Sequence, residues 1–182
     1  SAGQSATEAV NSLQGVLQLA GATGSDLAYT SETIASTLSQ FNLEAGKAGH
    51  IADVYAKAIS KSQANMTKLS YSMKYVGPVA SGLGISLETT TAALMKLYNT
   101  GYGGEQAGTY LKQAFQKLAS GTQDLKNKLQ ELGISYEEVN PQTRNFADII
   151  NTLKEKNIGV TESIAIFGET AGGAMAKLIE EG

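Results

Sequence analysis

Residues 83–88 read Leu-Gly-Ile-Ser-Leu-Glu and residues 132–137 read Leu-Gly-Ile-Ser-Tyr-Glu, so one six-residue pattern occurs twice with a single change. Glycine often follows a helix end, because it adopts the left-handed conformation needed there without strain. Serine is favoured just before a helix begins, where its hydroxyl accepts a hydrogen bond from a backbone N–H. At both places the pattern predicts a helix end with a glycine cap, an inward-pointing isoleucine, and a serine that caps the next segment.

Around these two turns, apolar residues recur every three or four positions, which is the spacing of amphipathic helices. Asp26, Asn42, Thr67 and Ser86 are the predicted N-caps in the first half of the chain. We predict an all-α fold of about eight to ten short helices joined by glycine turns. The predicted helices cover approximately residues 10–20, 26–41, 43–59, 68–83, 87–98, 105–119, 122–132, 146–156, 161–167 and 169–179.

Three features modify this helical pattern. Residues 134–145 are predicted to form either one small hairpin or an irregular loop, because an extended pattern is followed by a turn sequence. Gly77 and Pro78 are predicted to kink or interrupt the fourth helix, because proline lacks a backbone donor and clashes with the preceding turn. The chain is predicted to divide near residue 120 into two lobes. Residues 1–120 form a helical lobe with a faint internal repeat, and residues 121–182 form a smaller helical lobe packed on it.

The composition excludes several classes of protein. A chain of 182 residues with 42% hydrophobic residues is long enough for one sizeable core. Its 14 basic residues include one arginine, Arg144, and the net charge is −3, so sequence-specific binding to nucleic acid is not expected. The absence of cysteine excludes disulfides and thiolate metal sites. Because Ser1 stands where a methionine would normally be, we interpret the sequence as a piece of a longer protein.

No segment is expected to span a membrane. The longest uncharged apolar stretch, residues 75–87, has 13 residues and is broken by Pro78. A membrane span needs about 20 consecutive apolar residues.

Residues with catalytic or metal-binding chemistry are few. His50 is the only histidine, so a histidine-rich metal site has no second imidazole to use. Glu137-Glu138 and Glu180-Glu181 are adjacent acids, and neighbours in sequence point to different sides of a helix or strand. The eight tyrosines are interpreted as rings at the rim of the helical core, with their hydroxyls in water. We predict no catalytic, cofactor-binding or metal-binding residue and no enzymatic activity.

Small residues carry the clearest signal for helix contacts. Gly104 and Gly108 stand four positions apart on one predicted helix, and Gly172 and Gly173 lie between alanines on the last helix. Such residues leave a flat helix surface on which a second backbone can approach closely. We predict that these four glycines make helix contacts, either within the chain or between copies of it.

Several stretches resemble, in order, the core region of phage tail tape measure proteins. They are Leu-Ser-Tyr-Ser-Met-Lys-Tyr-Val-Gly-Pro-Val-Ala at residues 69–80, the hexapeptide at 83–88, Thr-Gly-Tyr-Gly-Gly-Glu-Gln-Ala-Gly-Thr at 100–109, Lys-Leu-Ala-Ser at 117–120, Leu-Gly-Ile-Ser at 132–135 and Ile-Phe-Gly-Glu-Thr-Ala-Gly at 166–172. The resemblance extends from about Leu19 to the C-terminus. It departs at residues 140–143, where Asn-Pro-Gln-Thr stands in place of the family's Asp-Gly type of turn.

The resemblance implies a structural virion protein encoded by a phage or prophage. Such a parent protein lies along the lumen of the tail tube, sets tail length, supports tail assembly and leaves ahead of the genome at ejection. It is made in the host cytoplasm, and its implied partners are further copies of itself, the tube protein and the tail chaperones. The long ruler region is absent here, because no heptad pattern is sustained over several repeats.

The sequence leaves two alternatives to an assembly role open. One is a cell-wall glycosidase module, which would need a buried glutamate with a raised pKa. The other is a membrane-active helical module, for which residues 75–87 are the best segment. We favour a structural role without a cofactor.

Overall fold

The computed structural model describes residues 6–182, so Ser1 lies outside the described residues. Within residues 6–182 the chain forms nine α-helices and two short 3-10 helices, and no strand. The predicted all-α fold of eight to ten helices is therefore confirmed. The elements are α1 (Ala6–Thr23), α2 (Leu27–Gln40), η1 (Ala45–Lys47), α3 (Ala48–Lys61), α4 (Met66–Gly82), α5 (Leu87–Asn99), α6 (Gly104–Ser120), α7 (Gln123–Glu131), η2 (Tyr136–Glu138), α8 (Phe146–Glu155) and α9 (Val160–Glu181).

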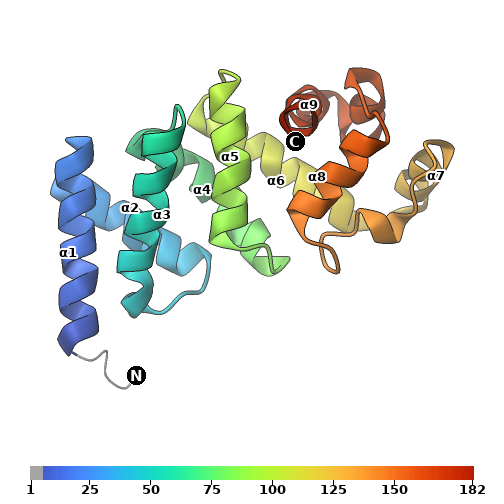
Figure 1. The fold of residues 1–182 in the computed structure, drawn as a ribbon. Coiled ribbons are helices and arrows are strands. Elements are labelled where there is room, and N and C mark those ends of the chain that lie inside the picture. Colours follow the sequence, from blue (N-terminus) through green and yellow to red (C-terminus); the bar gives the residue numbers. More distant parts are fainter. Residues whose placement is uncertain (1–5) are drawn as a thin grey trace.

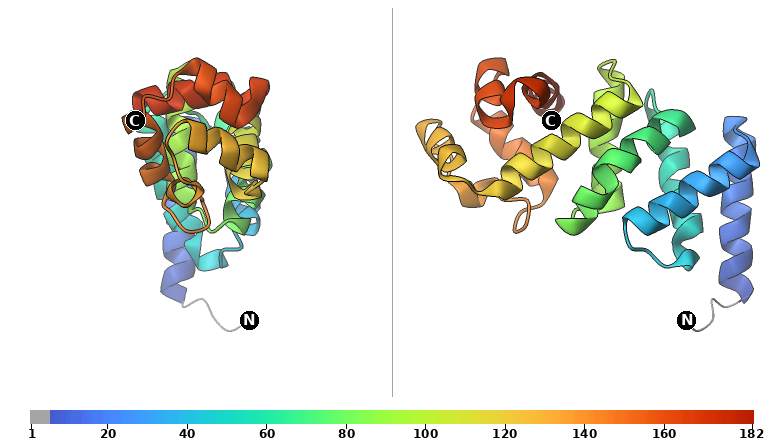
Figure 2. Two further views of the ribbon diagram at one scale, coloured as in Figure 1. Left: turned by 90° about the vertical axis from the view of Figure 1, so that its right-hand side faces the viewer. Right: turned by 180° about the vertical axis from the view of Figure 1, so that it is seen from behind.

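The helices form two layers that run side by side along the molecule. In Figure 1, α1, α3 and α5 stand upright in one layer while α2, α4 and α6 cross behind them, and Figure 2 shows this second layer from behind. Within a layer each helix packs on the next, α1 on α3 and α3 on α5, and likewise α2 on α4 and α4 on α6. Helix α9 then covers α5, α6 and α8. The result is an elongated array with α1 at one end and α7 at the other.

Six helix ends share one turn, in which a residue with positive φ is followed by a residue whose N–H bonds back to the last helical turn. Gly84 (φ +72°) and Gly133 (φ +68°) occupy this position in the two hexapeptides. The next residues, Ile85 and Ile134, are buried, and each donates its N–H to a helix carbonyl at 2.9 Å. The predicted glycine cap with an inward isoleucine is thus confirmed. The six residues with positive φ in these turns are Gly24, Asn42, Gly84, Gly101, Gly133 and Asn157.

Two of the four predicted N-caps, Asp26 and Ser86, are confirmed. The Asp26 carboxylate accepts the N–H of Tyr29, and the Ser86 hydroxyl accepts the N–H of Thr89. The predicted cap Thr67 is wrong, because Asn65 holds that position and accepts the N–H of Lys68.

The predicted cap Asn42 is also wrong. Its φ of +50° places it in the turn that ends α2, a conformation that asparagine tolerates better than most residues. The short helix η1 intervenes before α3 begins.

No hairpin forms at residues 134–145. Residues Tyr136–Glu138 form the 3-10 helix η2, and the carboxylate of Glu138 accepts the N–H of Ser135 at 2.7 Å. The Tyr136 hydroxyl donates to the carbonyl of Leu118 at 2.9 Å, and Val139 is fully buried. These local caps and anchors satisfy the segment without a partner strand, so the alternative of an irregular loop is the correct one.

Helix α4 is not interrupted at Gly77 and Pro78. It runs from Met66 to Gly82 with Pro78 inside it. Pro78 is exposed, and the carbonyl that loses its backbone donor belongs to Lys74, which is also exposed, so the proline ring disturbs no buried hydrogen bond there. The pronounced break in a helix lies instead at Gly168 in α9, with φ 86° and ψ 168°, where the two last predicted helices meet.

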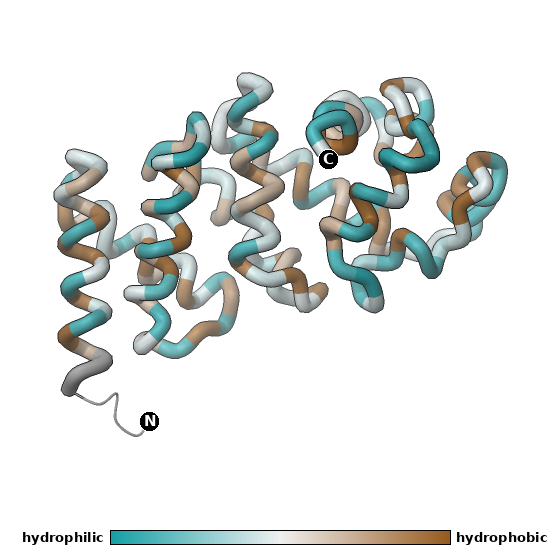
Figure 3. The backbone as a smooth tube through the Cα atoms, in the orientation of Figure 1, coloured by the Kyte–Doolittle hydropathy of each residue, from teal (hydrophilic) through white to brown (hydrophobic). Residues whose placement is uncertain are grey.

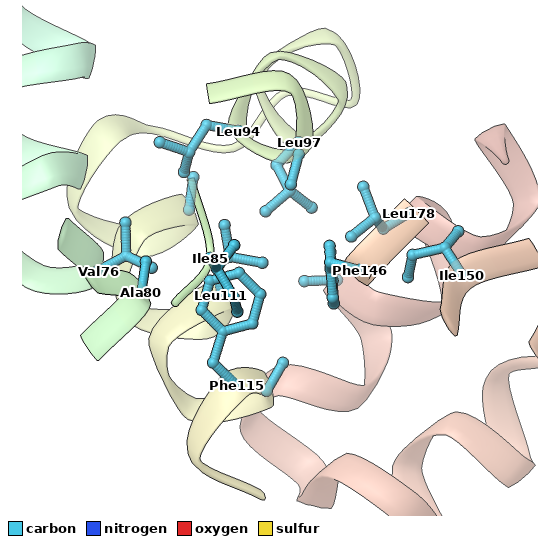
Figure 4. Packing of buried hydrophobic residues seen from close by; sticks show 14 of the residues in the cluster. Val76, Ala80, Ile85, Leu94, Leu97, Leu111, Phe115, Phe146, Ile150 and Leu178 are labelled. Atoms are coloured by element: carbon cyan, nitrogen blue, oxygen red, sulfur yellow. The ribbon is translucent and has the colours of Figure 1, made fainter. Parts of the chain in front are cut away.

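The buried apolar residues form one continuous cluster along the array. Figure 4 shows its centre, where residues from α4, α5, α6, α8 and α9 meet. Phe115 of α6 and Phe146 of α8 pack edge to face, with ring centroids 4.8 Å apart. Figure 3 shows how hydrophobic and hydrophilic residues alternate along the helices that surround this core.

Candidate functional site: the small-residue helix contacts

Helices α4 and α6 cross very closely, and two of the predicted glycines form the crossing. A methyl group added to Gly104 would lie 2.7 Å from the carbonyl oxygen of Lys68. One added to Gly108 would lie 2.6 Å from both the Cα and the carbonyl oxygen of Ser72. Real side chains essentially never approach backbone atoms so closely, so only glycine permits this contact. Both glycines therefore contact another helix of the same chain.

A buried hydrogen-bond chain joins three helices at this crossing. The Ser72 hydroxyl donates to the carbonyl of Gly104 at 2.6 Å, and the Tyr98 hydroxyl of α5 donates to the Ser72 oxygen at 2.7 Å. Ser72 and Tyr98 are fully buried. Burial raises the pKa of Tyr98, so its hydroxyl keeps its proton at neutral pH. The glycine contact and the hydrogen bonds depend on each other, because the Ser72 hydroxyl reaches the Gly104 carbonyl only when the backbones of α4 and α6 lie this close.

Tyr98 and Tyr55 do not lie at the rim of the core, as was predicted for the tyrosines. Both are fully buried, and the Tyr55 hydroxyl pairs with that of Thr37 at 2.7 Å. Their hydroxyls are satisfied by buried partners on other helices instead of by water. Tyr71, in contrast, is half exposed.

In α9 the two predicted glycines differ. Gly172 meets the first half of the same helix, which is folded back across Gly168: a methyl group on Gly172 would lie 2.5 Å from the Cα of Ile164. The buried Ser163 hydroxyl donates to the Gly172 carbonyl at 2.8 Å. Beside Gly173 the described residues leave open space. Gly173 is thus available for a methyl group, whereas Gly172 is not.

A third glycine crossing was not predicted from the sequence. A methyl group on Gly15 of α1 would lie 3.1 Å from the Cα of Gly49 in α3. The Ser12 hydroxyl donates to the carbonyl of Gly46 in the same region, at 3.3 Å. The available signal was a glycine inside each of two amphipathic helices, but nothing in the local pattern says that these two glycines face each other.

Gly77 has a packing role that was not predicted from the sequence. It is buried, and a methyl group there would lie 3.2 Å from the Cβ of Gln40 and 3.3 Å from the ring of Phe41. Gly77 therefore lets the C-terminal end of α2 lie close to α4.

The adjacent acids do not converge on a cleft. Glu137, Glu180 and Glu181 are exposed. A backbone hydrogen bond from Ser135 lowers the pKa of Glu138, and the Lys177 ammonium 2.9 Å away lowers the pKa of Glu180. A glycosidase general acid needs the opposite shift, so Glu138 and Glu180 do not fit that role.

His50 pairs with Glu88 across α3 and α5, and both side chains are about half exposed. Hydrogen bonds from the backbone N–H of Glu88 itself and from His50 lower the pKa of the Glu88 carboxyl. Glu88 also lines a groove of about 370 Å³ between α5, α8 and α9, whose walls include Ala92, Ile150 and Leu178. Glu88 supplies the one carboxylate side chain among the lining residues, and a glycosidase needs two.

Two further findings apply to the part of the chain that the structure describes. None of its helices has both the length and the hydrophobicity to cross a bilayer. Across residues 6–182, no three side chains of histidine, cysteine, aspartate or glutamate gather where a metal ion could be held.

The helical array and its glycine crossings can be set beside known proteins. The sequence profile of the family described as "Phage-related minor tail protein" matches residues 1–178. The chain belongs to the phage-related minor tail protein family. The tape measure protein of Pneumococcus phage Dp-1 is 36% identical over 188 residues, covering 100% of this chain. The probable tape measure protein of Escherichia phage P2 is 31% identical over 149 residues, covering 78% of this chain.

These matches confirm the resemblance to tape measure proteins. The chain spans only 16% of the length of the first relative and 18% of the second. No solved structure matches the chain.

Proposed function

We propose that this minor tail protein segment is a folded structural unit of a tape measure protein, which acts in tail assembly, tail length determination and genome delivery. The observation that carries the proposal is the family match over residues 1–178, together with tape measure relatives that match along the chain. The elongated helical array fits a role in which surfaces, and not an active site, do the work.

The proposal includes a location and partners. The parent protein is made in the host cytoplasm and is placed within the tail tube, where it associates with copies of itself, with the tube protein and with the tail chaperones. In this role the glycine crossings keep the array rigid: Gly108 and Gly172 hold backbones that a larger residue would force apart. The segment has no catalytic task in this proposal.

Complementation in a phage tests this role. A phage with a deleted tape measure gene is supplied with the parent gene, either unchanged or carrying Gly108→Leu, Gly172→Leu, His50→Ala or Glu138→Ala. We expect the two leucine variants to abolish or shorten tails seen by electron microscopy, because both glycines face backbone atoms. The two alanine variants should give normal tails, because His50 is exposed and Glu138 lies in the short helix η2, where its side chain accepts only the nearby N–H of Ser135. Normal tails after deletion of residues 6–182 would refute the role.

The glycosidase alternative has its own assay. Purified chain is incubated with peptidoglycan, and release of soluble sugar is measured. We expect no release. Release that a single Glu→Gln change abolishes would overturn the structural proposal.

A further inference from the structure

Helices α3 and α5 leave a groove of about 540 Å³ between them on the surface of the array, and we call it the α3–α5 groove. The two helices stand next to each other in the upright layer (Figure 1). At one end of the groove His50 pairs with Glu88. Beyond the other end the Asn99 side chain accepts the N–H of Gln63 at 2.9 Å. From His50 to Lys61 the groove follows α3 for about three turns, or about 16 Å.

The lining of this groove consists mainly of apolar and small side chains. Val54 and Ala58 come from α3, and Thr91, Ala92 and Met95 come from α5. Small side chains on a helix let the backbone of another helix approach closely, and apolar grooves between helices are a common docking place for a further helix. The α3–α5 groove therefore has the length and the lining that suit about three turns of a docked helix.

Two lysines on the α3 wall carry charge that the described chain does not balance. Lys57 and Lys61 line the groove, are exposed and stand four positions apart. Among residues 6–182 neither ammonium is paired with a carboxylate, whereas Lys128 and Lys177 each pair with one on their own helix. Like charges four positions apart on a helix repel each other and destabilise it. Two carboxylates at the same spacing on a docked helix would remove this cost.

Thr91 in the lining has a hydroxyl that makes no hydrogen bond to residues 6–182, although the residue is buried. The hydroxyls of Thr30, Thr33, Thr37 and Thr90 each donate to the carbonyl four residues earlier in the chain. Thr91 lacks this bond, and a buried hydroxyl without a partner costs free energy. A polar side chain on a docked helix would supply the partner. The unsatisfied hydroxyl and the repelling lysines thus occur at the same groove.

We propose that the α3–α5 groove binds an amphipathic helix of a partner protein, and that this helix carries two carboxylates four positions apart. The carboxylates lie against Lys57 and Lys61, and the apolar face of the helix lies on Ala58 and Ala92. Asp53 also lines the groove, one turn before Lys57, and it is exposed. A carboxylate opposite Asp53 would be repelled, so the acidic pair lies toward the end of the partner helix that faces Lys61.

The partner helix does not come from a second copy of this chain. The 17 acidic residues of the sequence include no two that stand three or four positions apart. A helix of a second copy therefore cannot present two carboxylates on one face at the spacing of the two lysines. Charge and spacing together favour a different protein as the source of the helix.

Fluorescence anisotropy with a synthetic helix tests the docking. The probe is a labelled amphipathic peptide of about 15 residues, long enough to span the groove. It has alanine and leucine on one face, a glutamine at the centre of that face, and two glutamates four positions apart near one end. A control peptide has lysines in place of the glutamates. We expect a dissociation constant on the order of 10 micromolar for the glutamate peptide and at least about tenfold weaker binding of the control.

Variants of the chain locate the binding. Lys61→Glu should weaken binding of the glutamate peptide at least about tenfold. Lys74→Glu is the matched control, because Lys74 is also exposed but lies on α4 outside the groove. Ala92→Leu should abolish binding by filling the groove, and circular dichroism verifies that this exposed change leaves the fold intact. Thr91→Val should raise the urea midpoint of unfolding and still weaken binding, since it removes an unpaired hydroxyl that the peptide would use.

Several results would overturn the proposal. They are equal binding of the two peptides, no binding of either, and binding that Lys61→Glu and Ala92→Leu leave unchanged. A dimer of the chain that Ala92→Leu abolishes would assign the groove to a second copy. Failure of the full-length parent protein to bind the peptide would show that its own chain fills the groove. Binding to phosphatidylglycerol vesicles that Lys61→Glu abolishes, without peptide binding, would assign the lysines to a lipid surface.

The docking rests on the proposed structural role, but the two fail separately. A chain that does not bind the glutamate peptide refutes the docking and leaves tail formation to be judged in the phage. Normal tails after deletion of residues 6–182 refute the tail role and leave peptide binding measurable in solution.

Discussion

Gly108→Ala is the change that most directly probes the α4–α6 crossing. The new methyl carbon would lie 2.6 Å from the Cα and the carbonyl oxygen of Ser72, whereas ordinary contacts lie at 3.4–4 Å. Both neighbours are backbone atoms, so no side chain can rotate away. The two helices must move apart, which also stretches the 2.6 Å hydrogen bond from the Ser72 hydroxyl to Gly104.

The expected cost is the sum of three contributions. Forcing a methyl group into a packed crossing costs about 1–3 kcal/mol. Weakening a buried hydrogen bond costs about 1–3 kcal/mol when the partners are left unsatisfied. The higher helix propensity of alanine offsets at most about 1 kcal/mol. With the middle of the first two ranges and an offset of about 1 kcal/mol, we expect Gly108→Ala to lower the free energy of unfolding by about 3 kcal/mol.

Gly173→Ala is the matched control, because Gly173 is also inside a helix but has open space beside it. Here alanine should raise the free energy of unfolding by about 0.5–1 kcal/mol through helix propensity alone. Urea unfolding followed by circular dichroism measures both variants, with unchanged m-values as the check that unfolding stays comparable. If the two variants shift the midpoint in the same direction by similar amounts, then the α4–α6 crossing does not depend on glycine at position 108.

Four further outcomes are expected. Ser72→Ala should lower the free energy of unfolding by about 1–3 kcal/mol, measured by urea unfolding, because the Gly104 carbonyl loses its side-chain donor and the Tyr98 hydroxyl keeps only the Lys68 carbonyl, 3.2 Å away. Pro78→Ala should leave the melting temperature unchanged or slightly raised, since α4 is already continuous and Pro78 is exposed. A fall of several kcal/mol in the free energy of unfolding would show that the proline ring is needed for packing. The pKa of Glu138 is lowered in the folded chain, so the ionised carboxylate stabilises the fold above the ordinary glutamate pKa of 4.5, and this stabilisation is lost as the pH falls through the lower folded pKa. Between neutral and acidic pH, the melting temperature of Glu138→Gln should therefore fall less than that of the unchanged chain. The proposed division into residues 1–120 and 121–182 should appear as two groups of amides with different hydrogen-exchange protection, and uniform protection would contradict it.

Most of the secondary structure could be predicted, because it depends on neighbours in sequence. The turn at Gly84 requires only a residue that tolerates positive φ and a following apolar residue, and both are visible in the hexapeptide. The caps at Asp26 and Ser86 were found for the same reason. Asn42 was misassigned because asparagine suits both a helix start and a left-handed turn, and the choice between them depends on the path of the chain in space.

The interruption of α4 expected at Pro78 did not occur, for a related reason. Proline inside a helix has a local cost, but that cost is small where the orphaned carbonyl belongs to an exposed residue, and exposure is a property of the folded chain. Gly168, by contrast, breaks α9 with a conformation that favours glycine, φ 86°, so the sequence did locate that break.

The amino-acid sequence by itself determined the helical class, the glycine turns and the family, because hydrophobic spacing, turn residues and ordered motifs are all read along the chain. Only the tertiary structure decided which glycines carry contacts. Gly172 and Gly173 are adjacent and share the same alanine-rich surroundings, yet one meets backbone atoms at 2.5 Å and the other meets open space. Likewise, Gly15 in α1 and Gly49 in α3 are 34 positions apart in the sequence, yet they face each other in the fold. A helix crossing depends on which residues the three-dimensional path of the chain brings opposite each other, and local periodicity does not contain that information.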